Sequence, residues 1–214
     1  MTNFIPLFPL EVVVFPGEKL NLHIFEERYK QLVKECVATK KPFGIPAVID
    51  SKISEIGTVV HIEKIVKEYD DGRMDITTIG GGVFRILEFI PSIPEKLFGG
   101  AIASFLENSE SKIPHVMKKL LPQLRDLHQL LEVEKKFDDE VNLTSYQIAH
   151  HAGMDIKQEY ELLNLLREDQ RLEYIKRHLA QVVPILSTMN DLKKRIQLNG
   201  HFKELKGFEF DGME

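Results

Sequence analysis

The sequence predicts an α+β protein with a β-rich first half, residues 1–108, and a helical second half, residues 109–214. Alternating apolar and polar residues, separated by turn residues, dominate the first half and are typical of strands. Apolar residues at helical spacing dominate the second half, and the polar stretch 108–112 separates the two. One helical stretch, near residues 25–41, interrupts the strands. We therefore expect a mostly antiparallel, barrel-like subdomain crossed by one helix, followed by a helical bundle.

The chain begins with two short apolar runs broken by prolines. Pro6 and Pro9 cannot donate a hydrogen bond to a sheet, so the first strand is expected at a sheet edge. Pro16 and the glycine after it favour a turn. The stretch 20–24 then alternates apolar and polar residues, which predicts a half-buried strand.

A helix is predicted next, with Pro42 ending it. Its apolar positions are Phe25, Tyr29, Leu32, Val33, Cys36 and Val37. Phe15 and Phe25 are predicted to be core residues that hold the first turn and this helix together. Cys36 is predicted to be a small buried apolar residue rather than a reactive thiol.

Further strands are predicted at 43–49, 55–67, 74–79 and 101–107. The alternation of the second of these strands slips near Glu63, which indicates a bulge. Asp71 and Gly72 form a strong hairpin signal, because Asp-Gly supplies the positive φ that such turns require. We expect Met74, Ile76 and Thr78 to share one face of the returning strand.

Three consecutive glycines at 80–82 could indicate a phosphate-binding loop or a kink in a sheet. A phosphate-binding loop needs a lysine and a Ser or Thr after its last glycine, at the start of a helix. Here a strand-like run from Val83 follows instead, so a sheet kink or barrel corner is predicted.

The loop 91–100 carries three large apolar residues, Ile93, Leu97 and Phe98, where a polar connection is usual. Two interpretations stay open. The side chains could fold back onto the sheet, or they could form a surface that binds polypeptides. Ile93, Leu97 and Phe98 are therefore the candidate polypeptide-binding residues of this sequence.

The helical half contains recognisable helix starts. Pro114 suits a first helical turn, and Pro122 is expected to kink that helix. Thr144 with Gln147 forms a capping box, and Asp155 is expected to cap the following helix. That helix is expected to direct Ile156, Tyr160, Leu163 and Leu166 to one side.

The last predicted helix carries a stripe of apolar residues alternately three and four apart. These are Leu172, Ile175, Leu179, Val182, Leu186, Met189, Leu192 and Ile196. Pro184 is expected to interrupt the stripe, which argues against a continuous coiled coil. Packing inside a bundle is the favoured interpretation, and a dimer seam, which would make the protein a homo-oligomer, is the alternative. The tail from Lys203 is expected to fray.

Composition limits the classes of partner and compartment. The net charge of -5 argues against nucleic acid or an anionic membrane as a partner. No apolar run approaches the roughly 18 residues that span a bilayer. The single cysteine and the absence of a signal-peptide pattern at the start predict a cytoplasmic protein.

No catalytic, cofactor-binding or metal-binding motif is found. Residues 145–155 resemble a helix-turn-helix, but the second helix is acidic and would repel a phosphate backbone. His150 and His151 are adjacent on a predicted helix and point about 100° apart, so they do not favour a shared metal ion. His-Glu-x-x-His, Cys-x-x-Cys and Gly-x-Ser-x-Gly are all missing. We therefore assign no catalytic residue, cofactor or metal.

Three blocks of sequence together resemble one known family. The first is Pro-Leu-Phe-Pro-Leu from Pro6, with Val-Val-Val-Phe-Pro-Gly and His-Ile-Phe-Glu-x-Arg-Tyr after it. The second begins at Ile56 and includes Asp-Gly-Arg and Phe-Arg-Ile, and the third lies between Ile148 and Glu173. In this order they resemble the N-terminal, substrate-binding domain of Lon proteases, in its small stand-alone form. The triple glycine departs from the family pattern, in which one glycine and a charged pair are usual.

The resemblance implies a fold and a function. It implies a PUA-like topology for the first half and binding of unfolded or extended polypeptides, or of a partner protein, without catalysis. The ATPase and Ser/Lys peptidase modules of a full Lon protease are expected to be absent, so enzyme activity is not predicted. RNA binding through the PUA-like barrel is one alternative, which a continuous basic groove would support. A cryptic hydrolase is a second, which would need a polar pocket with clustered titrating groups.

Overall fold

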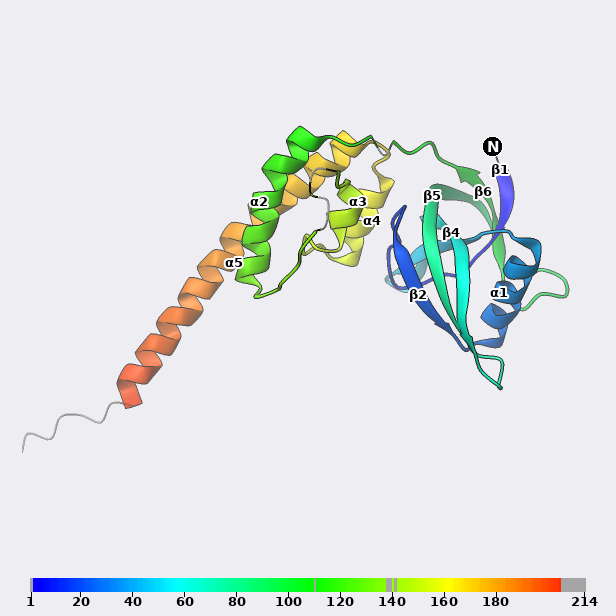
Figure 1. Ribbon diagram of the computed structural model, residues 1–214, viewed down its shortest axis with the longest axis horizontal. Helices are drawn as coiled ribbons and strands as arrows, with labels where there is room; N and C mark the ends of the chain where they lie inside the picture. The colour runs from blue at the N-terminus through cyan, green and yellow to red at the C-terminus, as the bar shows by residue number, and fades with distance from the viewer. Residues whose placement is uncertain (1, 110, 138–139, 141, 205–214) are drawn as a thin grey trace, which may run out of the picture.

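The computed structural model describes residues 2–109, 111–137, 140 and 142–204. Figure 1 shows a strand-rich half and a helical half side by side, joined by an extended segment after the last strand. The strands are β1 (Thr2–Pro6), β2 (Lys19–Ile24), β3 (Phe43–Ile49), β4 (Lys52–Glu68), β5 (Met74–Ile90) and β6 (Gly100–Phe105). The helices are α1 (Glu27–Thr39), α2 (Pro114–Leu130), α3 (Ser145–Ala149), α4 (Ile156–Asn164) and α5 (Glu168–Glu204). This confirms the predicted α+β fold.

The strands form one antiparallel sheet in the order β1-β6-β5-β4-β3, and β2 also pairs with β5. The segment that follows β1, residues 7–10, pairs with β3 through isolated parallel bridges at Leu7–Gly44 and Leu10–Ala47. These bridges bring the first and last strands of the order together, so the sheet curves into a barrel. The long strand β5 pairs with β2 near its start and with β6 near its end.

The three glycines lie where β5 passes from β2 to β6. The register with β4 shifts between the pairs Thr58–Val83 and Val60–Gly80, which confirms a local irregularity of the sheet. A Cβ on Gly80 would overlap the carbonyl oxygen of Phe15. Glycine is therefore required there by a close backbone approach.

The barrel core lies under α1. Tyr29, Leu32, Val33 and Cys36 of this helix are buried, and their neighbours include Phe43 of β3. Cys36 is therefore buried, as predicted. Val37, which was also predicted on the apolar face, is exposed.

Phe15 and Phe25 differ sharply in burial. Phe15 is fully buried, as predicted, but Phe25 is 60% exposed, so the prediction of a core role for Phe25 is wrong. The reason is the start of α1, which begins at Glu27 with Glu26 as its N-cap. Phe25 lies before the helix, where helical spacing no longer determines the direction of a side chain. Its ring stacks near the ring of His23 instead, with centroids 6.2 Å apart.

A second core joins the two halves. It contains Val13, Phe15 and Val83 from the first half and buried residues of all four later helices. The ring of Phe15 stacks on that of Tyr146, with centroids 5.3 Å apart. The boundary at 108/109 stays a prediction, since secondary structure changes between Phe105 and Pro114 while the core is continuous.

The helix starts follow the sequence signals. Thr144 and Gln147 form the predicted capping box of α3, and Asp155 caps α4 by accepting a hydrogen bond from the Gln158 backbone at 2.8 Å. Because α4 ends at Asn164, Leu166 lies outside it. Its predicted place on the α4 face is therefore wrong.

Helix α5 runs continuously through Pro184, so the predicted interruption is wrong. The start of its apolar stripe, Leu172, Ile175 and Leu179, is buried in the shared core. The later residues Met189, Leu192 and Ile196 are exposed, and packing within a bundle does not extend to them. Most of the tail from Lys203 lies outside the described residues. No described helix combines the length and apolar character needed to cross a membrane.

Candidate functional site

The structure separates the three residues of the predicted polypeptide-binding loop. Phe98 is only 5% exposed and belongs to the barrel core. Ile93 is partly buried against the same core, whereas Leu97 is 63% exposed. Two of the three therefore fold back onto the barrel, and Leu97 faces solvent.

Helix α1 fixes the conformation of this loop. The Gln31 side chain donates to the Glu95 carbonyl at 3.1 Å and accepts from the Leu97 backbone N–H at 2.7 Å. The Lys96 ammonium pairs with the Glu35 carboxylate at 2.7 Å. The loop thus presents its side chains from a defined position, although it has no regular secondary structure.

A groove of about 450 Å³ lies between this loop, β1 and the end of α1. It is lined by Asn3, Phe4, Ile5, Pro6, Glu35, Cys36, Thr39, Lys41, Pro42, Ile93, Lys96, Phe98 and Phe105. Most of these side chains are apolar. Phe4 and Phe105 remain 42% and 37% exposed, so two aromatic rings are accessible at this groove.

Phe4 and Phe105 are functional candidates that the sequence did not reveal. They lie about a hundred positions apart and line the same groove because β1, which carries Phe4, pairs with β6, which carries Phe105. A Cβ on Gly100 would overlap the Phe4 ring, so this glycine gives the ring its place on the sheet. The signal in the sequence was weak, because Phe4 stands in a short strand next to the chain start.

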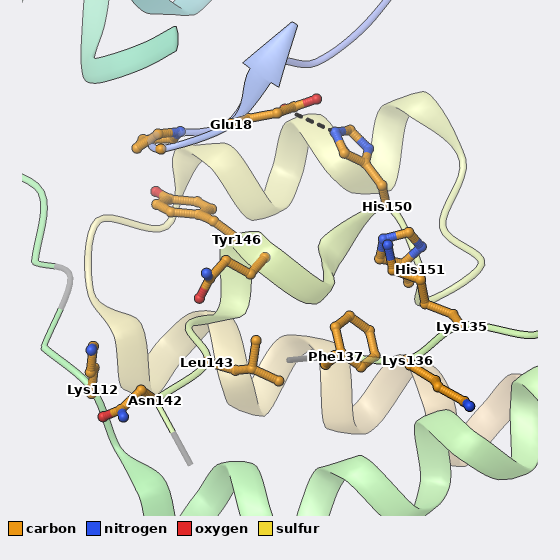
Figure 2. Close-up of a pocket in the computed structure, with 13 residues that line it drawn as sticks. Glu18, Lys112, Lys135, Lys136, Phe137, Asn142, Leu143, Tyr146, His150 and His151 are labelled. Carbon is orange, nitrogen blue, oxygen red and sulfur yellow. Dashed lines mark hydrogen bonds and ion pairs between the residues drawn. The ribbon is translucent and has the colours of Figure 1, made fainter. Parts of the chain in front are cut away.

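A larger cavity of about 670 Å³ lies between the two halves (Figure 2). It is lined by Pro16, Gly17, Glu18, Lys112, Lys135, Lys136, Phe137, Asn142, Leu143, Tyr146, Gln147, His150 and His151. The turn before β2 provides one wall, and α3 with the segment before it provides the other. A hydrolase would need clustered titrating groups in such a cavity, and RNA binding would need a continuous basic surface.

His150 links the two halves at this cavity. One ring nitrogen lies 3.1 Å from a Glu18 carboxylate oxygen, and the other lies 2.8 Å from a Glu159 carboxylate oxygen. Burial alone would lower the pKa of His150, but the hydrogen bonds to Glu159 and Glu18 outweigh it and raise that pKa to about 10. A protonated imidazole with both nitrogens occupied is unsuited to act as a general base.

The neighbouring groups do not complete a hydrolytic site. Burial, followed by the charge of Lys135, lowers the pKa of His151. Among the described residues that line the cavity, none is a serine or cysteine that could act as a nucleophile. Among the described residues, no group of three or more His, Cys, Asp or Glu side chains is arranged to hold a metal ion.

The lysines of the cavity do not form one basic surface. Figure 2 shows Lys112 and Lys136 on opposite sides of the cavity, and Glu18 lies on a third side. A nucleic-acid site usually presents a continuous basic patch to the phosphates. The arrangement therefore gives the RNA-binding alternative little support.

Arg171 and Glu168 form a buried ion pair that the sequence did not reveal. The Arg171 guanidinium pairs with Glu168 at 2.8 Å and also donates to Ser145, Asn108 and the backbone carbonyls of two further residues, Leu165 and Ser109. It lies 4.1 Å from the centre of the Tyr146 ring. These contacts fasten the segment that connects the halves to the helices, so this network is structural.

Comparisons with known proteins agree with the fold. The family model of the ATP-dependent protease La (LON) substrate-binding domain matches residues 5–181. A Lon N-terminal domain protein from Xanthomonas campestris is 25% identical, with a TM-score of 0.61 over 80% of this chain and 95% of that one. The N-terminal domain of a Mycobacterium avium complex Lon protease is 12% identical, with a TM-score of 0.62 over 84% of this chain and 100% of that one.

Proposed function

Because the chain belongs to the family of the ATP-dependent protease La (LON) substrate-binding domain, we propose that it binds polypeptide segments without catalysing a reaction on them. The observation that carries this proposal is the apolar groove beside β1, where Phe4 and Phe105 stay accessible. Exposed aromatic rings beside an apolar groove are typical of sites where apolar side chains of a partner are buried.

The groove favours apolar rather than charged side chains of a ligand. Its lining includes Glu35, Lys41 and Lys96, of which Glu35 and Lys96 neutralise each other in an ion pair. Burying one large apolar side chain of a ligand is worth roughly 1.5–3 kcal/mol, so two such side chains would give measurable binding. The ligand class is therefore an unfolded or extended chain that exposes apolar residues.

The groove is tested with the double variant Phe4→Ser/Phe105→Ser. Binding of fluorescein-labelled β-casein, an unfolded polypeptide, is measured by anisotropy. Loss of two aromatic contacts is expected to weaken binding at least tenfold, since truncation of a central aromatic contact often costs over about 1 kcal/mol. The matched control is Ile185→Ser, which removes an exposed apolar residue of α5. Equal affinity of the double variant and the control would contradict the proposal.

The loop residues differ in the test that each permits. Leu97→Ser removes an exposed side chain, so it is expected to leave the melting temperature unchanged and to weaken casein binding if the loop contributes. Phe98→Ser removes a buried ring and is expected to destabilise the barrel. Unchanged binding by Leu97→Ser would restrict the site to the groove itself.

The non-catalytic part of the proposal has its own test. The purified protein is incubated with ATP and β-casein, and both are followed by phosphate release and gel electrophoresis. Neither is expected to be consumed, because the sequence has no phosphate-binding loop for ATP and the described residues of the cavity offer no serine or cysteine nucleophile for casein. Turnover that stays with the protein through several purification steps would overturn this part.

A further inference from the structure

Residues 86–90 of β5 pair with β6 but not with β4, and a register shift between Ile86 and Glu88 makes this edge irregular. Three further stretches of the described strands lack a neighbour on one side. They are the outer side of β1, the second half of β4 beyond the end of β3, and the outer side of β2. Unpaired edges of this kind attract other strands, and proteins usually protect them. The three stretches differ in how they are protected.

The edge of β1 is blocked. The Leu7 backbone N–H donates to the Gly99 carbonyl, so the backbone groups of Leu7 point toward β6. Backbone groups alternate in direction along a strand, so those of Phe4 and Pro6 point outward, away from β6. The Phe4 backbone N–H is taken by the Asn3 side chain at 2.9 Å, and Pro6 has no N–H. Another strand would find few donors there.

The free part of β4 is protected by irregularity and charge. Its register with β5 shifts between Ile62 and Lys64 and again between Ile65 and Lys67. Bulges that close together break the regular spacing that a partner strand needs. The stretch 61–68 also carries several charged side chains, which further disfavour pairing.

The edge of β2 has neither protection. All six of its residues pair with β5 in one unbroken register, from Lys19–Ile79 to Ile24–Met74, and none is a proline. The Gly80 backbone N–H donates to the Glu18 carbonyl at 2.8 Å, so Leu20 and every second residue after it face β5. The backbone groups of Lys19, Asn21 and His23 therefore face away from β5.

These outward backbone groups are unused. In the part of the chain that the structure describes, residues 19–24 form no backbone hydrogen bond outside the ladder with β5. The side chains beside them are already engaged, since Asn21 accepts from the Thr77 hydroxyl at 3.0 Å and His23 pairs with Asp75 at 2.5 Å. The backbone itself is thus the available recognition element.

An exposed aromatic residue follows this edge directly. Phe25 is 60% exposed and stacks near His23. Figure 1 shows β2 at the side of the barrel nearer to the helical half, with its start next to the cavity of Figure 2. An added strand would therefore meet open backbone along β2 and one aromatic side chain at its end.

We propose that β2 is a docking edge at which an extended segment of a substrate polypeptide adds to the sheet as a further strand. The inference rests on the proposed function, since the ligand class is the same, but the site is separate from the groove beside β1. Main-chain hydrogen bonds give the affinity in this mode of recognition, and side chains add preference. Binding is thus tolerant of sequence, with an apolar or β-branched residue favoured next to Phe25.

The test removes a single outward donor. Asn21→Pro deletes the outward N–H, and a proline is tolerated in an edge strand where its nitrogen faces solvent. Asn21→Ala loses the same side-chain contact with Thr77 but keeps the N–H, so it is the matched control. The probe is a fluorescein-labelled peptide, Lys-Thr-Val-Thr-Val-Thr-Val-Lys, compared with the same peptide N-methylated at alternate residues.

The peptide is expected to bind Asn21→Pro at least tenfold more weakly than Asn21→Ala, and the N-methylated peptide is expected to bind wild type at least tenfold more weakly than its parent. Equal affinity in both comparisons overturns the docking edge. If Asn21→Pro does not fold, the comparison of the two peptides on wild type is used alone. Weaker binding of the N-methylated peptide then supports the docking edge, and equal affinity overturns it.

The groove variant separates this inference from the proposed function. If Phe4→Ser/Phe105→Ser weakens casein binding while Asn21→Pro binds both casein and the peptide normally, the docking edge fails and the proposed function stands. If neither variant weakens binding of either probe, both fail. If Asn21→Pro binds the peptide more weakly and Phe4→Ser/Phe105→Ser binds both probes normally, the docking edge is supported and the groove is excluded as the binding site of the proposed function.

Discussion

The junction between the two halves and the outer edge of β2 treat hydrogen-bonding groups in opposite ways. At the junction, the Arg171 guanidinium, which has five donors, is surrounded by acceptors from Glu168, Ser145, Asn108 and two backbone carbonyls. At the edge of β2, the outward backbone groups have no partner among the described residues. Buried polar groups must be paired, whereas exposed polar groups can hydrogen-bond to water and stay available for a ligand.

This contrast locates stability and binding in different places. Changes at the junction should lower the free energy of unfolding, and changes at the β2 edge or in the groove should alter binding with little effect on stability. A variant that mixes the two effects would weaken the comparison.

The largest effect is expected for Arg171→Met. The variant leaves Glu168 as a buried carboxylate without its cation, and breaking a buried pair in this way costs about 3–5 kcal/mol. The measurement is urea unfolding of the variant and wild type. Arg167→Met is the control, because the exposed Arg167–Asp169 pair is worth no more than about 1 kcal/mol. Similar losses in both variants would show that the junction is not specially stabilised.

A comparable loss is expected for Phe15→Ala, and none for Phe25→Ala. Phe15 is fully buried, and removal of a buried ring costs about 3–5 kcal/mol. Phe25 is mostly exposed and should change stability by about 0.5 kcal/mol or less. Thermal melts of both variants decide the point. A large loss for Phe25→Ala would place that ring in the core and remove it from the β2 docking edge.

The opposite fates of these two rings show what sequence alone could predict. The strands, the Asp-Gly hairpin and the capping box are local features, and residues close in the sequence specify them. Phe25 has the correct spacing for the helix face but precedes the first helical residue, Glu27, so periodicity alone misplaced it.

The candidate sites depend on contacts between distant residues. Phe4 and Phe105 share a groove because β1 pairs with β6, and Arg171 reaches Asn108 across 63 positions. The open edge of β2 is likewise a property of the whole strand order. The loop 91–100 was found from composition, because apolar residues in a connection are unusual, but its packing could not be predicted.

An intermediate effect is expected where the backbone of the turn meets β5. Gly80→Ala would force a Cβ against the Phe15 carbonyl, and overpacking of this kind costs about 1–3 kcal/mol. Gly82→Ala is the matched control, since no heavy atom of the described residues beyond its chain neighbours lies within 4 Å of a Cβ there. Urea unfolding of the two variants measures the difference. If Gly82→Ala were the more destabilising, the close approach at Gly80 would not be the reason for glycine in this strand.

The smallest effect is expected from His150, which joins Glu18 before β2 to Glu159 of α4. Its hydrogen bonds to these carboxylates outweigh burial and raise its pKa from 6.5 to about 10 in the folded protein. A histidine with a raised pKa stabilises the fold fully below its unfolded pKa, and this contribution is lost as pH rises through the folded pKa. The stabilisation should therefore be complete near pH 6 and decline between about pH 6.5 and 10. Because the pair is partly exposed, we expect only about 1–2 kcal/mol.

The measurement is urea unfolding of wild type and His150→Gln at pH 6, 8 and 9.5. The difference in unfolding free energy should be largest at pH 6 and shrink as pH rises, because glutamine carries no charge to lose. His151→Gln serves as the control, since burial lowers the pKa of His151 and its removal should leave the decline above pH 7 in place. A constant difference between wild type and His150→Gln across this range would mean that the imidazole stays neutral between its two carboxylates. The junction would then be held by packing of Phe15 on Tyr146 and by Arg171, without a contribution from this charge.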